Sequence, residues 1–224
     1  MAGFNKNVFG NQHGYSAMNR ELKSAIDLML GDSVTFKLHA PPLIKEKTFK
    51  VVAINTYDFE SSTDSEFVLQ GSSRTPIYMS IENNSDSVEI RLSVMLKHST
   101  VRTLFSENEL AEVIDNEDGL VEIHRLVDTD AVGSKLAEYA GWTAPKYYRQ
   151  AFGVRGYHHK DDFRNKSIPQ KKAQHEKNCE EFDYYCLVSS DEKHVVEIAI
   201  YNDNEDVMLT FVTDEQIIEE LLRG

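Results

Sequence analysis

The chain has 224 residues, of which 41% are hydrophobic and 27% charged, and its formal net charge at pH 7 is -13. This composition is typical of globular proteins and excludes an intrinsically disordered or fibrous chain. The negative charge disfavours nonspecific binding of the whole chain to nucleic acid or to an anionic membrane. The length suffices for one large domain or two small ones.

The N-terminal segment predicts no export signal. MAGFNKNVFGNQHGYS lacks the apolar region of a signal peptide, and no uninterrupted apolar run reaches the roughly 18 residues of a membrane helix. We therefore expect a cytoplasmic protein without a membrane span. In that compartment Cys179 and Cys186 are expected to stay reduced, and Cys186 is expected on the apolar face of a strand as a small core residue.

Local patterns predict the first elements. Residues 16–30 carry apolar side chains at the spacing of one helix face, and Gly31 follows where a C-cap would end that helix. Two strands are expected next, at 34–38 and 49–53, because their apolar residues alternate. The acidic, serine-rich run 57–65 predicts an exposed hairpin turn.

Two later stretches, residues 64–94 and 181–212, have the pattern of three-stranded antiparallel meanders. Apolar and polar residues alternate in both, so each strand has one apolar face. Adding 119 to the apolar positions of the first stretch gives those of the second: Phe67, Leu69, Ile77, Met79, Ile81, Val88, Ile90 and Leu92 become Cys186, Val188, Val196, Ile198, Ile200, Val207, Leu209 and Phe211. The match indicates an internal repeat; the alternative is the general likeness of any two meanders.

The predicted fold class is α+β. Two antiparallel β-meanders, each followed by a helix that begins with a capping-box pattern, pack with an N-terminal helix and a helical connector. The organisation is a flexible N-terminal arm (1–15), a first α+β half (16–129), a partly helical basic and aromatic connector (130–180), and a second meander with a C-terminal helix (181–224). Helix is expected in the connector near Lys146–Phe152 and Gln170–Cys179, because a structureless loop of this length is uncommon.

Short motifs occur along residues 31–93. They are Gly31-Asp32 ahead of an alternating strand, Phe49-Lys50-Val51-Val52, Tyr57, Glu66-Phe67-x-Leu69 and Ile81-Glu82. This combination resembles a family of bacterial domains of unknown function, and the overall layout is similar to the YjfK type of bacterial protein. The resemblance implies a β-rich protein associated with membrane-stress operons. It implies no catalytic residue, and the tryptophan expected in the strands of that domain is absent.

One cluster contains residue types that bind metal. His158, His159 and Asp161 are close in sequence, and His175 precedes Cys179 by four residues, the spacing of one helix face. These residues define an alternative function, a metal-dependent enzyme that uses His158, His159, Asp161 and His175. Neighbouring lysines oppose a cation, however, and structural zinc sites show two ligand pairs at defined spacing. We therefore expect a solvated loop, with neither a metal nor another cofactor.

The connector is locally basic and follows an aromatic stretch. Between residues 155 and 177, seven basic side chains oppose three acidic ones. The predicted binding residues are Trp142, Tyr147, Tyr148, Arg155, Tyr157, Arg164, Lys171 and Lys172. Basic residues with aromatics bind anionic partners, and Tyr, Trp and Arg dominate protein interfaces. In the alternative interpretation, the aromatics belong to the core and the basic groups pair with the protein's own carboxylates.

These observations predict a non-catalytic bacterial accessory or adaptor protein. It would bind a protein partner through an open sheet edge or through the connector, and a homo-oligomer is compatible with either surface. No phosphate-binding loop and no nucleophile elbow occurs in the sequence, so no catalytic residue is assigned. A phage or virion structural protein is a further alternative.

Overall fold

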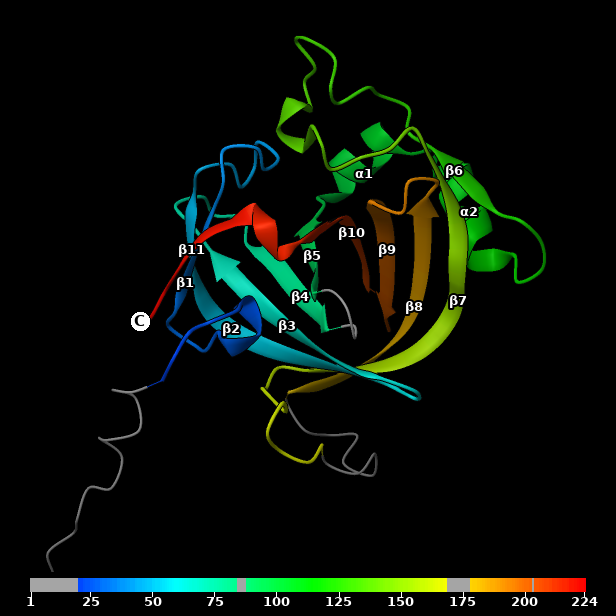
Figure 1. The fold of residues 1–224 in the computed structure, drawn as a ribbon. Coiled ribbons are helices and arrows are strands. Elements are labelled where there is room, and N and C mark those ends of the chain that lie inside the picture. Colours follow the sequence, from blue (N-terminus) through cyan, green and yellow to red (C-terminus); the bar gives the residue numbers. More distant parts are fainter. Residues whose placement is uncertain (1–19, 84–87, 169–177, 203) are drawn as a thin grey trace, which may run out of the picture.

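The computed structural model describes residues 20–83, 88–168, 178–202 and 204–224, and most of its elements are strands (Figure 1). The strands are β1 (Ser33–Phe36), β2 (Thr48–Phe59), β3 (Thr63–Gln70), β4 (Ile77–Asn83), β5 (Val88–Met95), β6 (Glu122–His124), β7 (Lys146–His159), β8 (Cys179–Ser189), β9 (His194–Tyr201), β10 (Asn204–Asp214) and β11 (Ile218–Leu222). The helices are α1 (His98–Leu104) and α2 (Glu107–Asp115), with short 3-10 turns η2 (Ala25–Asp27), η3 (Ala137–Tyr139) and η4 (Glu215–Ile217).

The strands form one antiparallel sheet that closes on itself. Their order is β11-β1-β2-β3-β4-β5-β10-β9-β8-β7-β6, and an additional pairing joins β2 to β7. In this pairing Thr56 to Phe59 lie opposite Gly156 to His159, and the two strands meet at the lower edge of Figure 1. The eight strands β2–β5 and β7–β10 therefore form a closed barrel. Strands β1 and β11 extend the sheet from the first half of β2, and β6 extends it from the first half of β7.

The barrel contains two four-stranded units with matching ladders, β2–β5 and β7–β10. Phe67 pairs with Met79 in the first unit, as Tyr185 pairs with Ile198 in the second. Phe67 therefore corresponds to Tyr185, and the predicted match of Phe67 with Cys186 is wrong by one residue. The reason is that the paired residues Phe67 and Met79 are 12 positions apart, whereas Tyr185 and Ile198 are 13 apart. In the third strands Met79 pairs with Leu92 and Ile198 with Val207, so Leu92 corresponds to Val207, and the predicted match of Val88 with Val207 is wrong by four residues.

The two units meet at two seams, which are the strand pairs β5–β10 and β2–β7. Both seams follow the same two-fold symmetry. At the first seam, Val94 of β5 pairs with Leu209 of β10, and the ladders of the two units make these residues equivalent. At the second seam, Asp58 of β2 pairs with Tyr157 of β7, which are also equivalent. Each seam thus joins a residue to its own counterpart, as a two-fold axis through the barrel requires.

Alternate side chains of the barrel strands lie in two environments. One set is at most 1% exposed and belongs to a single apolar core: Phe67, Leu69, Met79, Leu92, Leu187, Ile198 and Leu209. The residues between them line a cavity to which all eight barrel strands contribute. Because successive side chains of a strand point to opposite faces, the apolar set points away from the cavity. Its burial therefore depends on accessory segments, which add Leu28, Phe36, Leu104 and Ile217 to the same core.

The predicted α+β fold class is wrong, because the helices it required are mostly replaced by strands. Helix α2 lies after the first meander as predicted. In residues 16–30 the described part contains only the single turn η2, and the helix expected after the second meander is replaced by η4 and β11. Strand β11 pairs with β1, so long-range pairing overrides the local helical spacing.

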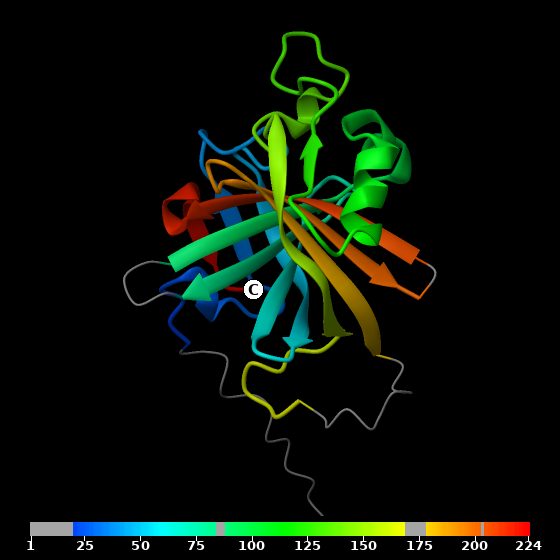
Figure 2. The same ribbon diagram turned by 90° about the vertical axis from the view of Figure 1, so that its right-hand side faces the viewer.

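The predicted helical connector is also wrong where the structure describes it. Residues Lys146–Phe152 lie within β7, whose aromatic side chains favour a strand. Two irregularities, between Arg149 and Ala151 and between Ala151 and Val154, bend this strand so that its halves pair with β6 and β2. In Figure 2, β7 faces the viewer with α2 beside it. The predicted arm (1–15) and nearly all of the predicted helix Gln170–Cys179 lie outside the described residues.

At the second seam, the rings of Phe59 and Phe182 approach the backbone of Gly156 so closely that they leave no room for a side chain. A Cβ at Gly156 would lie 2.6 Å from Cζ of Phe182 and 2.9 Å from Cε1 of Phe59. We expect Gly156→Ala to lower the free energy of unfolding by about 1 to 3 kcal/mol, because the added methyl group overpacks this contact. Urea denaturation measures the loss. Adding Phe182→Leu should restore part of it, and an unchanged unfolding midpoint for Gly156→Ala would contradict the contact.

Candidate ligand-binding cavity

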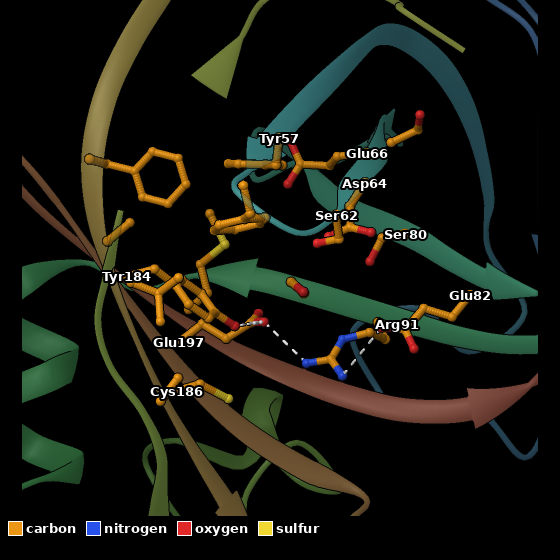
Figure 3. A pocket seen from close by; sticks show the side chains of 18 of the residues that line it. Tyr57, Ser62, Asp64, Glu66, Ser80, Glu82, Arg91, Tyr184, Cys186 and Glu197 are labelled. Carbon is orange, nitrogen blue, oxygen red and sulfur yellow. Dashed lines mark hydrogen bonds and ion pairs between the residues drawn. The ribbon is translucent and has the colours of Figure 1, made fainter. Parts of the chain in front are cut away.

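A cavity of about 390 Å³ lies within the barrel, and every barrel strand contributes to its wall (Figure 3). The lining includes Tyr57, Phe59, Asp64, Glu66, Ser80, Glu82, Arg91, Ser93, Val154, Phe182, Tyr184, Cys186, Glu197, Ala199, Asp206 and Met208. Sites for small molecules have volumes of about 300 to 1,000 Å³, so this cavity is large enough for one.

One wall carries an ion pair that is tied into a hydrogen-bond network. Nη2 of Arg91 lies 3.2 Å from Oε1 of Glu197, and the Tyr184 hydroxyl donates to the same oxygen at 2.7 Å (Figure 3). The Thr210 hydroxyl donates to the other oxygen of Glu197. Burial lowers the pKa of Arg91, but the charges of Glu197, Tyr184, Cys186 and Glu82 together outweigh burial and raise that pKa. The guanidinium is therefore a permanent charge held within the barrel.

Glu66 lies across the cavity from this ion pair, as Figure 3 shows, and makes no ion pair within the described residues. It is 7% exposed and accepts a hydrogen bond from Nδ2 of Asn55 at 2.9 Å. Burial is the main reason that its pKa rises to about 7; the charge of Glu197 adds to the rise, while hydrogen bonds from Asn55 and Tyr57 oppose it. Near pH 7 Glu66 thus holds a proton about half of the time.

Aromatic rings form another part of the wall. The ring of Phe182 meets those of Tyr57 and Phe59 edge to face, with centroids 5.6 and 5.7 Å apart. Phe59 makes a similar contact with Tyr184 at 5.7 Å, and Tyr57 stacks on His158 at 4.7 Å. Such contacts fix the ring orientations, so the aromatic wall is preorganised.

The lining is strongly acidic. Five carboxylates contribute to it, against the single guanidinium of Arg91: Asp64, Glu66, Glu82, Glu197 and Asp206. The pKa of Asp64 is raised by burial and by the charge of Glu82, and that of Asp206 by burial and by the charge of Glu180. At both residues burial is the main cause and a neighbouring carboxylate adds to the rise, so Asp64 and Asp206 each lie close to another negative charge.

No protein-family model, curated protein or solved structure matches this chain. The resemblance to bacterial domains of unknown function accordingly stays a prediction, and the cavity must be interpreted from its own geometry. Among the described helices, none is both long and apolar enough to cross a membrane.

The predicted metal cluster is divided between two environments. His158 is largely buried beside the aromatic wall, and burial lowers its pKa to about 4, so the imidazole is neutral at pH 7. Nε2 of His159 lies 4.0 Å from Sγ of Cys179, and Asp161 is exposed in the turn after β7. Within the described ranges, no three His, Cys, Asp or Glu residues are grouped to hold a metal ion. His175 lies outside these ranges, so a metal-dependent enzyme stays a prediction.

The predicted binding residues of the connector fall into three groups. Lys171 and Lys172 lie outside the described residues, Trp142 and Tyr147 are buried in the apolar core, and Tyr148, Arg155, Tyr157 and Arg164 lie on β7 or just after it. A buried ring cannot contact a partner at the surface, so the structure assigns Trp142 and Tyr147 a packing role. A binding role for the others stays a prediction.

The two described arginines of this set contact the protein itself. Nε of Arg155 lies 3.2 Å from a carboxylate oxygen of Glu181. Nη2 of Arg164 lies 2.8 Å from Oδ2 of Asp162, and its guanidinium lies over the ring of Phe67. These contacts favour the alternative interpretation, in which basic groups of the connector pair with the protein's own carboxylates.

Sequence reasoning missed the cavity because its residues resemble surface residues. The run 57–65 was predicted to be an exposed turn, yet β2 continues to Phe59, β3 begins at Thr63, and side chains from the run line the cavity. Cys186 is buried, as predicted, but it lies on the cavity side of β8 instead of the apolar side. A signal was present in the strand alternation, because Glu66, Arg91 and Glu197 place charges in mid-strand opposite a mostly apolar face.

Proposed function

We propose that this protein is a non-catalytic binding protein that holds a small organic molecule inside the barrel. The observation that carries the proposal is the cavity with charged side chains on opposing walls. Burying charged groups costs free energy, and a small barrel built for stability alone would fill its interior with apolar side chains. Here the apolar residues face the accessory segments, and the interior retains space and hydrogen-bonding groups.

The chemistry of the lining groups supports binding rather than catalysis. Burial raises the pKa of Cys186 to about 11, so its sulfur stays a thiol instead of the nucleophilic thiolate. Oγ of Ser93 lies 2.7 Å from Oγ1 of Thr210, a hydroxyl that cannot act as a strong general base. The carboxylate of Glu197 is held by three donors. These groups can orient a ligand through hydrogen bonds.

A screen against a mixed library of small cations, anions and neutral molecules tests this proposal. Ligand-observed NMR should find compounds that bind the wild type. The same compounds should fail to bind Ala199→Trp, because an indole at this lining position fills the cavity. Ala131→Trp, at an exposed loop position, is the matched control and should bind normally. A folded Ala199→Trp variant that still binds every compound, or a library without a ligand, would overturn the proposal.

The adaptor role predicted from the sequence is a separate proposal that the cavity neither requires nor opposes. Since Arg155 and Arg164 pair within the chain, its candidate surfaces are the terminal strands of the described sheet, β6 and β11. An edge strand offers backbone groups for pairing with another chain. The virion role likewise stays a prediction.

A further inference from the structure

We infer that the cavity selects an organic cation, a molecule with an ammonium group and an apolar body. The ammonium group would lie between the carboxylates of Glu66 and Glu197, and the body would lie against the aromatic wall. This inference rests on the proposed binding function and specifies the class of ligand.

The distribution of charge is the first argument. Arg91 is the only basic residue in the described lining, and its guanidinium already lies 3.2 Å from Glu197, 3.8 Å from Glu89 and 4.0 Å from Glu82. An anionic ligand would have to displace one of these carboxylates and would then face the others. Glu66 has no basic partner among the described residues, and a cationic ligand would provide one. Because Coulomb energies grow as water is excluded, this preference is large inside a barrel.

The aromatic wall is the second argument. Tyr57, Phe59, Phe182 and Tyr184 present rings around the same cavity. The negative face of an aromatic ring attracts ammonium groups, and the attraction increases when both are desolvated. The rings also bury the apolar part of a ligand. Carboxylates and rings together therefore fit a molecule that is cationic at one end and apolar at the other.

Proton exchange at Glu66 gives the inference a measurable signature. The titratable groups that interact with Glu66 are Tyr57 from β2, Tyr78 from β4, and Glu197 and Tyr201 from β9, and none of them is basic. The basic group of the described lining, Arg91, lies across the cavity and is paired with Glu197. A bound ammonium group favours the ionised form of Glu66, whose pKa in the free protein is about 7. Binding should then release a proton, and affinity should rise with pH up to about 7 and level off above it.

The test compares three molecules of similar shape: 2-phenylethylammonium, 2-phenylethanol and phenylacetate. Isothermal titration calorimetry at pH 6 and pH 8 should show the ammonium compound binding at least about tenfold more tightly than the alcohol, with no detectable binding of the acid. Its affinity should be higher at pH 8. The same comparison applies to every ammonium compound in the library and its neutral analogue, so that one poorly shaped probe does not decide the result.

Two variants separate Glu66 from other carboxylates. Glu66→Gln should weaken binding of the ammonium compounds about tenfold at pH 8 and remove the increase between pH 6 and pH 8. Glu112→Gln makes the same chemical change at an exposed position of α2. It should alter neither the affinity for the ammonium compounds nor the increase of that affinity between pH 6 and pH 8. If neutral or anionic compounds bind the wild type more tightly than the ammonium compounds do, and Ala199→Trp no longer binds them, the cation assignment is overturned. The proposed binding function would still stand in that case. A library without any ligand for the wild type would overturn both.

Discussion

Replacing Arg91 with methionine should lower the free energy of unfolding by about 3 to 5 kcal/mol at pH 7, the usual loss when one partner of a buried ion pair is removed. Methionine preserves most of the apolar stem but removes the charge. The carboxylate of Glu197, which is 18% exposed, would then remain inside the barrel without its cation. Urea denaturation followed by circular dichroism measures the loss.

Two further variants test whether the loss comes from the uncompensated carboxylate. Adding Glu197→Gln to Arg91→Met removes that charge, so the double variant should be more stable than the single one. Arg102→Met breaks an exposed ion pair with Glu107 on the outside of the protein and should cost only about 0 to 1 kcal/mol. Equal losses for Arg91→Met and Arg102→Met would contradict the buried network described above.

Glu66→Gln should stabilise the protein at pH 8 by roughly 3 kcal/mol and leave its stability nearly unchanged near pH 4. The folded protein raises the pKa of Glu66 from 4.5 to about 7, and each pH unit between these values corresponds to about 1.36 kcal/mol. The folded state binds this proton more tightly, so the contribution of Glu66 to stability falls as pH rises from about 4.5 through 7. Glutamine does not ionise, so the variant avoids this loss.

The measurement is the difference in unfolding free energy between Glu66→Gln and the wild type across pH 4 to 8. Taking a difference matters because His158, whose pKa is lowered to about 4, acts in the opposite direction and reduces stability as pH falls below 6.5. Both proteins contain His158, so its effect cancels. For Glu112→Gln the difference in unfolding free energy from the wild type should not change with pH. A difference that is also independent of pH for Glu66→Gln would contradict the raised pKa of Glu66.

The sequence predicts those parts of the fold that local patterns encode. Alternation places all six strands of the two meanders, and helical spacing with Ser106 ahead of it places α2. Barrel closure joins Thr56–Phe59 to Gly156–His159, about 100 residues apart, and no local pattern specifies such a pairing. The same limit explains why the C-terminal segment was assigned to a helix, since β11 forms only beside β1.

The cavity could be predicted only in part. The sequence shows which residues share a strand face, so it groups Asp64 with Glu66 and Arg91 with Ser93. It does not show which face a closed barrel encloses. Charged residues are rarely buried without partners, so Glu66 and Glu197 are expected at the surface until the accessory segments are known to cover the apolar face instead.

The internal two-fold arrangement of the barrel has a consequence for how a ligand would sit. Toward the apolar core the two units present similar side chains, but toward the cavity they differ. Glu66 pairs with Ser80 in the first unit, and at the equivalent place Tyr184 pairs with Ala199 in the second. Rotating a guest by half a turn would therefore exchange a carboxylate for a phenol and a hydroxyl for a methyl group. A near-symmetric backbone thus encloses a directional interior, and an elongated guest should bind in one orientation in preference to the same guest turned end for end.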